Sequence, residues 1–208
     1  MTHVRTLEPF RDAQCRSAID CARMGGMMVL ADPAGVALLC MMAPAQFVDA
    51  GAINRMATHA RGLVCLALDS QIVDRLHLAL QPQTNRRRFA TPFTVSIEAA
   101  CVVSTGISAA DRATTIAAAI HPLARPGDLA TPGHIFPIRV EGGSPRSSSD
   151  IPGVAVEICR RAGLRPAAVI CDILDPTGAV PGTQWLLRHA AVQRLQVFSC
   201  DSIAIADS

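Results

Sequence analysis

The sequence predicts a mixed β-sheet covered by helices, and three observations support this. Short apolar segments alternate with segments of helical periodicity, but without the strict strand-helix-strand rhythm of an all-parallel sheet. Half of the 208 residues are apolar, so the chain can bury a continuous core. No repeat or interdomain linker divides the sequence, so we expect a single domain over residues 1–208.

Helices are expected where apolar residues recur every three or four positions, or where a capping residue opens such a run. Asp49 can cap a helix that continues to about Ala60. Ser108 and Asp111 form an S-x-x-D capping box that opens a helix to about Ile120. The other predicted helices span residues 11–23, 154–162 and 183–190, with a short one from Asp69.

Strands are expected where short apolar runs lie between turn signals. Residues 27–31 and 36–42 flank a turn at residues 32–35, so together they predict a hairpin. The remaining predicted strands span residues 62–68, 93–97, 135–140, 167–174 and 196–200. Residues 81–88 and 142–152 are predicted loops, because they are rich in Pro, Gly, Ser and Arg.

Composition excludes several functions. The net charge is only +2 and 17% of the residues are charged, so we expect no nucleic-acid partner. All 19 basic residues are Arg and the chain has no Tyr, which excludes a Schiff-base lysine and a tyrosine general acid. The eight cysteines contain no C-x-x-C pair and have no nearby His at ligand spacing, so no zinc site is expected.

The sequence also suggests where the protein resides. Met1 to Arg11 has no apolar segment of the kind found in secretion signals, so we expect a cytoplasmic protein with reduced thiols. The apolar run from Met27 to Val48 is interrupted by Asp32, Pro33 and Pro44, so we expect buried structure and no membrane span.

Several segments, taken in order, carry a family resemblance. The most specific is S-T-G-I-S-A-A-D-R-A-T-T-I at residues 104–116. The others are G-G-M-M-V at 25–29, A-I-N-R-M-A at 52–57, R-G-L-V-C-L at 61–66, F-T-V-S-I-E-A at 93–99, R-P-G-D at 125–128, P-G-H-I-F-P at 132–137 and A-V-I-C-D-I at 168–173. Over roughly residues 16–205 the chain resembles 3,4-dihydroxy-2-butanone 4-phosphate synthase, the lyase of riboflavin biosynthesis.

The resemblance implies a three-layer α+β fold and a homodimer. It also implies a lyase that converts ribulose 5-phosphate to dihydroxybutanone phosphate and formate, with magnesium holding the substrate. Two of the family's essential residues persist at least in part: the histidine of P-G-H is His134, and the glutamate after the late strand is Asp172. Cys65 matches a cysteine that lies near the substrate in the family.

The family's acidic loop, of the form D-D-E-D-R-E-N-E-G-D, is the main departure. This chain keeps Asp32, but the position of the substrate-binding arginine is Gly35 and that of the metal-binding glutamate is Val36. Leu38 and Cys40 replace a further glutamate and the final aspartate. Four of the loop's polar functions are therefore absent from the sequence.

The second metal ligand in the family belongs to an R-x-G-H-T-E motif at the start of a helix. Counting back from Val154, the histidine position is Ile151, while Pro152 removes a backbone N–H and Arg146 lies two places out of register. Neither Val36 nor Ile151 can coordinate magnesium, which prefers oxygen ligands. We therefore expect no metal site and no cofactor.

Each retained residue has a functional and a structural interpretation. His134 is a candidate general acid or base, or alternatively a structural hydrogen-bonded histidine. Asp172, near the end of an apolar strand, is a candidate catalytic carboxylate or one member of an ion pair. Cys65 is a candidate substrate contact, although a free cysteine in a strand is commonly part of the core. Asp111 and Arg112 are expected to maintain the scaffold.

Further candidates would bind a small-molecule ligand. Thr105 precedes a helix N-terminus where hydroxyl groups and amides can hold an oxyanion, and Arg88 is the arginine that the family keeps before its phenylalanine. Asp32 is the acidic remnant of the loop. Val36 and Leu38 begin an apolar wall that suits an apolar ligand, or that packs as an ordinary strand once its charges are unnecessary.

Three functions remain open, in this order. The first is metal-independent acid–base chemistry (enolisation, dehydration or cyclisation) on a less polar carbonyl compound in specialised biosynthesis, with His134 and Asp172 moving protons. The second is a catalytically silent partner that pairs with an active homologue or binds a ligand. The third is the ordinary conversion of ribulose 5-phosphate, ranked last because three elements of its site are missing.

Overall fold

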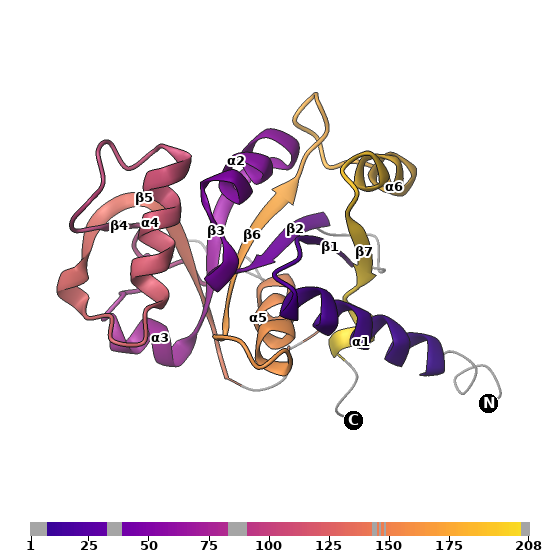
Figure 1. Cartoon of the computed structure of the whole chain (residues 1–208), viewed down its shortest axis with the longest axis horizontal. Helices are drawn as coiled ribbons and strands as arrows, with labels where there is room; N and C mark the ends of the chain where they lie inside the picture. Colours follow the sequence, from indigo (N-terminus) through magenta and orange to yellow (C-terminus); the bar gives the residue numbers. More distant parts are fainter. Residues whose placement is uncertain are drawn as a thin grey trace.

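The computed structural model describes residues 8–32, 39–82, 91–142, 145, 147 and 149–204, with side chains from Ala13 onward. Seven strands form one mixed sheet in the order β4-β5-β3-β6-β2-β1-β7 (Figure 1). The strands are β1 (Met28–Ala31), β2 (Leu39–Pro44), β3 (Arg61–Asp69), β4 (Ile97–Ala99), β5 (Leu129–Val140), β6 (Ala167–Ile173) and β7 (Gln196–Ser199). The mixed sheet predicted from the sequence is confirmed.

Strand directions follow from the chain's connections. β1 and β2 form the predicted antiparallel hairpin, and β6 pairs antiparallel with both β2 and β3. β5 runs parallel to β3 and antiparallel to β4, while β7 runs parallel to β1. β3 and β6 therefore lie in the interior of the sheet, each with a neighbouring strand on both sides.

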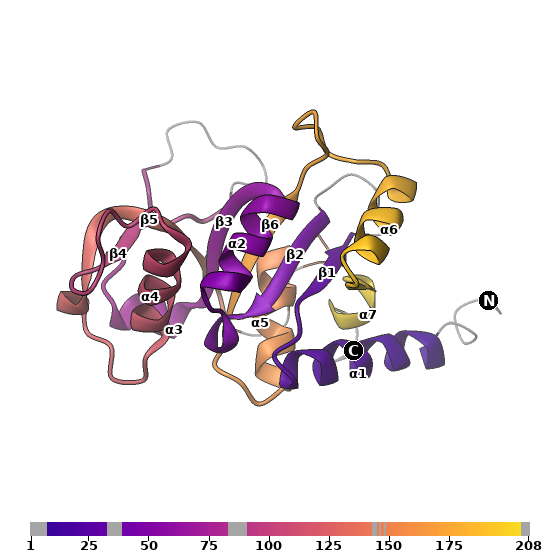
Figure 2. The ribbon, with the colours of Figure 1, turned by 45° about the horizontal axis from the view of Figure 1, so that its top comes forward.

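Helices cover both faces of the sheet and make three layers (Figures 1 and 2). Buried side chains of α1 (Glu8–Arg23), α5 (Ile151–Arg161) and α7 (Asp201–Ala204) share one apolar core with one face of the sheet. Those of α2 (Ala50–His59), α3 (Ser70–Arg75), α4 (Ala109–Ile120) and α6 (Thr183–Val192) share a second core with the opposite face. Among the described residues, no helix combines the length and apolar character needed to cross a membrane.

Two predicted helix starts are confirmed by their capping bonds. The Asp49 carboxylate accepts a hydrogen bond from the Ala52 amide at 2.7 Å, and the Ser108 hydroxyl accepts one from the Asp111 amide at 3.0 Å. Each bond satisfies a backbone donor that the first helical turn leaves unpaired.

Some predicted boundaries are wrong. The strand expected at residues 93–97 lies at 97–99, because Phe93 and Thr94 make only isolated bridges to Ile138 and Leu80. β5 begins at Leu129 and not at residue 135, since the strand continues through Pro132-Gly133 with a shift in register. α5 begins at Ile151, within the predicted loop 142–152, because Asp150 caps it and Pro152 is tolerated in a first helical turn.

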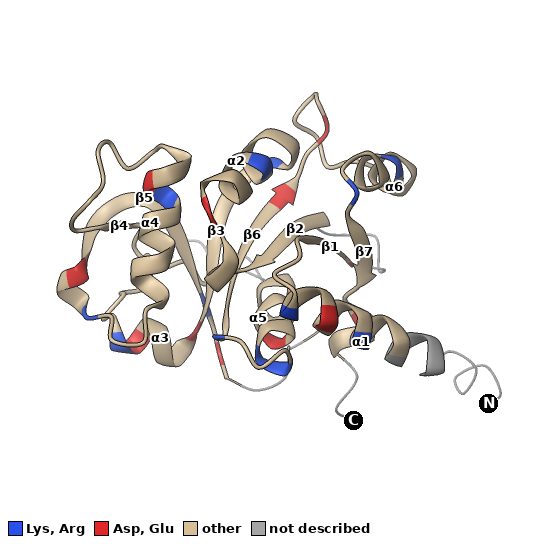
Figure 3. Cartoon of the chain, in the orientation of Figure 1, with Lys and Arg blue, Asp and Glu red and all other residues tan. Residues whose placement is uncertain are grey.

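Acidic and basic positions are intermixed along the ribbon (Figure 3). The end of α5 is an example: Arg160 bridges Asp69 and Glu157, and Arg161 also pairs with Glu157. Glu157 and Asp69 are both buried, so these pairs compensate the charges of two buried carboxylates. The network ties α5 to the end of β3, far along that strand from Cys65.

Candidate functional site

Four of the predicted site residues gather at one end of the sheet. β1 and β6 end there, and β2 and β3 begin there. Asp32 directly follows β1, Asp172 is the penultimate residue of β6, and Cys65 is the central residue of β3. His134 lies in β5 beside the same part of β3.

Strand register places three of these side chains on one face. Cys65 is paired with Phe136 of β5 and with Ile170 of β6. Because side chains alternate along a strand, His134 and Asp172, each two residues from a partner of Cys65, point to the same face as Cys65. β3 separates their strands, so their Cα atoms are about 10 Å apart, twice the spacing of neighbouring strands. The two side chains therefore face the same side of the sheet, with β3 between them.

His134 forms an ion-pair contact with Glu98. The His134 Nδ1 and Glu98 Oε2 atoms are 3.0 Å apart, and the side chains are 42% and 15% exposed, respectively. An ionised carboxylate only accepts hydrogen bonds, so the Nδ1 atom is the donor whenever Glu98 is ionised. In the tautomer with the proton on Nδ1, the Nε2 atom is the unprotonated nitrogen, on a side chain that is 42% exposed.

Asp172 lies among buried thiols. Burial raises the pKa of Asp172, so its carboxyl group keeps its proton to a higher pH than an exposed aspartate does. Burial, followed by the nearby charges of Asp172 and Cys171, raises the pKa of the Cys65 thiol to about 12. Cys65 is only 6% exposed and belongs to the apolar core, so it is a neutral thiol packed beside the carboxyl group, as the structural interpretation expects.

The loop before α4 packs against Glu98. Gly106 has φ +79°, and a Cβ atom built on it would lie 1.4 Å from the Glu98 Oε1 atom. Thr105, predicted as a ligand contact, is therefore adjacent to the His134–Glu98 pair, with an exposed side chain. The loop is fixed by Asp111, whose carboxylate accepts hydrogen bonds from Ser104 and from the Gly106 amide.

The sequence alone suggests no role for Glu98, which belongs to the F-T-V-S-I-E-A segment that carries the resemblance. A signal was present, because a glutamate that alternates with buried Ile97 and Ala99 needs a partner on the opposite face of the strand. The missing information was the partner, which lies 36 residues away in sequence.

The residues at the altered positions do not fit magnesium. Val36, at one of the two metal-ligand positions, lies outside the described residues. Cys40, at the position of the acidic loop's final aspartate, is fully buried, and burial raises the pKa of its thiol well above the ordinary value. Ile151 is 2% exposed and packs in the core beneath α5. Magnesium prefers oxygen ligands in octahedral geometry, and no group of three His, Cys, Asp or Glu side chains within the described ranges could hold a metal ion.

A hydrogen bond joins the two altered segments. The Ser149 hydroxyl, just before α5, donates to the Asp32 Oδ2 atom, just after β1, at 2.8 Å. Asp32 is 5% exposed, so this carboxylate is engaged with the protein and its predicted contact with a ligand stays a prediction. Three other predicted ligand contacts, Val36, Leu38 and Arg88, lie outside the described residues.

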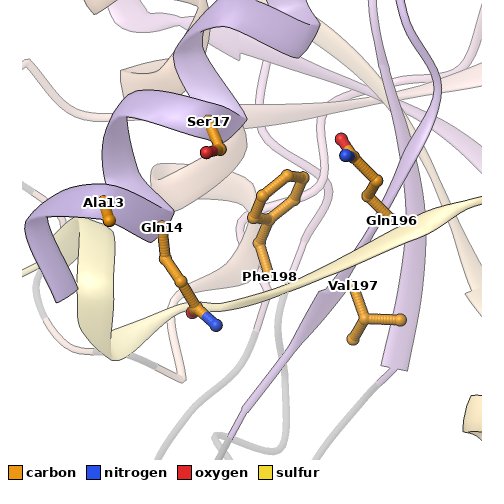
Figure 4. Close-up of a pocket in the computed structure, with 6 residues that line it drawn as sticks. All are labelled: Ala13, Gln14, Ser17, Gln196, Val197 and Phe198. Atoms are coloured by element: carbon orange, nitrogen blue, oxygen red, sulfur yellow. The ribbon is translucent and has the colours of Figure 1, made fainter. Parts of the chain in front are cut away.

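Two pockets in the described part of the chain lie away from these side chains. One, of about 320 Å³, lies between α1 and β7, where Gln14 and Ser17 face Phe198 and Gln196 (Figure 4). The other, of about 420 Å³, lies at the start of α2 beside Phe47 and Arg55. Neither brings together titratable groups comparable to those around His134.

Comparison with known proteins identifies close relatives over most of the chain. A family model described as 3,4-dihydroxy-2-butanone 4-phosphate synthase matches residues 16–205. A protein of this name from Chromobacterium violaceum is 40% identical over 191 residues, which cover 90% of each chain. Another from Neisseria meningitidis is 44% identical over 157 residues, 76% of this chain and 43% of that protein. The chain therefore matches less than half the length of the Neisseria relative.

Solved structures show the same fold. RibBX from A. baumannii, described as a two-domain 3,4-dihydroxy-2-butanone 4-phosphate synthase, has a TM-score of 0.84 at 32% identity, covering 90% of this chain and 56% of that one. A 3,4-dihydroxy-2-butanone 4-phosphate synthase in complex with two magnesium ions has a TM-score of 0.80 at 28% identity, covering 90% and 93%. The α+β fold that the resemblance implied is confirmed.

Proposed function

The chain belongs to the 3,4-dihydroxy-2-butanone 4-phosphate synthase family, and we propose that it carries out this family's proton transfers on a ketose phosphate, with ribulose 5-phosphate as substrate. The shared name of its relatives supports this ordinary reaction over the repurposed one that we ranked first from the sequence. The observation that carries the proposal is the His134–Glu98 pair on the same face of the sheet as Asp172, because it supplies a base and an acid there.

His134 is the base in this proposal. Its Nε2 atom removes a proton from the carbon next to the substrate's carbonyl group, and the electron pair of the broken C–H bond moves to form an enediolate. The Glu98 carboxylate holds the Nδ1 proton and stabilises the imidazolium that results. Proton removal of this kind by a positioned side chain contributes about 10²- to 10⁴-fold to a rate.

Asp172 is the acid. Burial raises the pKa of Asp172, so it keeps its proton to a higher pH than an exposed aspartate, and delivery of that proton to the carbonyl oxygen neutralises the developing enediolate. Cys65 stays a neutral thiol and contributes a contact surface beside the carboxyl group. The described residues do not form a magnesium site, so no step of this proposal passes through a metal ion.

The assembly follows the family expectation. We propose a homodimer of a single synthase-like domain, with no nucleic-acid partner and a cytoplasmic location. Analytical ultracentrifugation tests the dimer directly: a sedimentation coefficient of the monomer at micromolar concentration would contradict it.

The central experiment uses ribulose 5-phosphate with the purified chain in deuterated water, with and without magnesium. Complete turnover is measured as formate release, and proton removal alone is measured as deuterium incorporation at carbon. The proposal expects deuterium incorporation that His134→Asn abolishes. If neither deuterium nor formate appears with the folded protein, the proposed function is wrong and the silent-partner function is favoured.

A second candidate function is metal-independent acid–base chemistry on a less polar carbonyl compound. The observation that favours it is specific: a buried cysteine and a buried isoleucine, Cys40 and Ile151, occupy positions where the family has an acid and a metal-binding histidine. The same deuterium experiment separates the two candidates, because an unphosphorylated, less polar ketone would then exchange faster than ribulose 5-phosphate.

A further inference from the structure

We propose that Asp111 is a positioning residue for His134, acting through the loop 104–106 and the Glu98 carboxylate. The inference rests on the proposed function, since it assigns a role to His134. It extends that function to a residue for which the sequence suggested only helix capping. The argument has three steps, from α4 to the loop, from the loop to Glu98, and from Glu98 to His134.

In the first step, Asp111 fixes the loop. Its Oδ1 atom accepts from the Ser104 amide at 3.2 Å, and its Oδ2 atom accepts from the Ser104 hydroxyl at 2.9 Å and the Gly106 amide at 3.1 Å. The bond from the Ser104 hydroxyl, with the other donors, holds the pKa of Asp111 below its ordinary value, so the carboxylate is ionised. Asp111 is 8% exposed, and charged acceptors of this kind make the stronger hydrogen bonds.

In the second step, the loop confines Glu98. The Gly106 backbone lies so close to the Glu98 carboxylate that a side chain at position 106 would occupy the same space. Its φ of +79° is a conformation that residues with a side chain rarely adopt. Glycine at position 106 therefore allows both this backbone conformation and the close approach to Glu98. If the loop moves, the wall on one side of the Glu98 carboxylate moves with it.

In the third step, Glu98 sets the orientation of His134 through the contact between Oε2 and Nδ1 at 3.0 Å. The same turn of α4 also fixes the strand that carries Glu98. The Thr115 hydroxyl donates to the Asp111 carbonyl oxygen at 2.9 Å, and its oxygen accepts from the Ala99 amide at 3.0 Å. Asp111 therefore holds the strand next to Glu98 through Thr115, and it confines the Glu98 carboxylate through the loop.

Capping alone does not account for this arrangement. Ser108 already caps α4 through the Asp111 amide, and it does so without the Asp111 carboxylate reaching the loop. This gives a matched pair of variants at one helix end. Ser108→Ala removes the cap and leaves the three hydrogen bonds from the loop to the Asp111 carboxylate. Asp111→Asn keeps the cap but replaces one of the two carboxylate oxygens by an amide NH₂ group, which donates and cannot accept.

The test measures the tautomer of His134 by long-range ¹H–¹⁵N NMR of histidine-labelled full-length protein, with the signal assigned through His134→Asn. We expect the wild type and Ser108→Ala to show the proton on Nδ1, and Asp111→Asn to shift the ¹⁵N signals toward a mixture of tautomers. In turnover or deuterium exchange, Asp111→Asn should lower kcat on the order of tenfold with little change in KM, since only orientation is lost.

Two results would overturn the inference. One is an unchanged tautomer in folded Asp111→Asn, and the other is an equal change in Ser108→Ala, which would reduce Asp111 to a stabilising residue. Gly106→Ala is the second variant: because its new methyl group displaces the Glu98 carboxylate, it should shift the same signals even if Asp111→Asn does not fold. If the wild type turns over no substrate, the proposed function fails, but the tautomer measurement still decides the role of Asp111.

Discussion

The two halves of the candidate site differ in how the fold holds them. His134, Glu98 and Asp172 lie within strands, where pairing with neighbouring strands fixes their position and face. Of the two former metal positions, Val36 lies outside the described residues and Ile151 is the first residue of α5. A buried apolar side chain such as Ile151 can replace a ligand there without changing any strand register. The acid–base half is thus tied to the fold, while the metal half could change independently of it.

The largest expected effect concerns the acid–base half. His134→Asn should lower deuterium exchange or turnover about 10²- to 10⁴-fold, because it removes the base and leaves the fold intact. His77→Asn is the matched control: His77 is exposed, has φ +53° and lies in the turn after α3, where asparagine is well tolerated. Equal rates for both variants would remove His134 from the mechanism.

The next effect concerns the metal half. Ile151→His should destabilise the protein by roughly 2 kcal/mol or more, because an imidazole would replace a side chain that is 2% exposed in the core. Urea unfolding measures the change, and Ile107→His, at a 56% exposed position, should leave stability almost unaltered. A stable Ile151→His variant that binds magnesium would show that the metal half is still preformed.

Asp172 should have a smaller effect, on thermal stability, and the direction of its pH dependence follows from its raised pKa. Its pKa is raised in the folded state, so the unfolded chain loses this proton first as the pH rises, and the folded state becomes less stable from the ordinary carboxyl range upward. At a pH where both states are protonated, the effect is absent. Asp172→Asn should therefore raise Tm by a few degrees at pH 7 while lowering activity, and the gain should disappear as the pH falls below about 4, the ordinary range of aspartate.

Asp175 is the matched control, because its pKa is shifted in the opposite direction and its replacement should change Tm in the opposite direction. Its pKa is lowered, chiefly by a hydrogen bond from the Thr177 hydroxyl, so its ionised form stabilises the fold at neutral pH. Asp175→Asn should lower Tm at pH 7, and this loss should fade as the pH falls through the carboxyl range. Parallel Tm shifts in the two variants would contradict the buried environment assigned to Asp172.

Thiol reactivity gives a further, smaller contrast. With a pKa of about 12, Cys65 is almost entirely protonated at pH 8 and should resist iodoacetamide. Cys101 is exposed and should react first, which peptide mass spectrometry can show. Cys101→Ser should then remove the fast phase of labelling. Rapid labelling of Cys65 in the native protein would contradict its packed, neutral state.

The smallest expected effect is that of magnesium on the wild type. A ligand that binds the folded state raises Tm by mass action, so millimolar magnesium should leave Tm unchanged if the donor set is missing. Calcium at the same concentration controls for ionic strength. A rise in Tm specific to magnesium would mean that residues outside the described ranges complete a site.

The sequence predicts most of the fold because its signals are local. The caps at Asp49 and Ser108 and the hairpin at residues 27–42 depend on neighbours in the chain, and all three are confirmed. The boundaries of β4 and β5 are wrong because isolated bridges and a register shift depend on distant pairing. The site follows the same rule: His134 and Asp172 stand out locally, whereas Glu98 and the reach of Asp111 appear only once the chain is folded.

The position of β3 between β5 and β6 determines where a substrate must lie. His134 and Asp172 belong to strands that do not touch each other, since a whole strand intervenes. Under the proposed function both side chains act at the carbonyl end of the ketose phosphate, so that end has to lie above β3, between the two outer strands. The order of the strands, and not any single side chain, therefore fixes the place of the reacting carbon atoms.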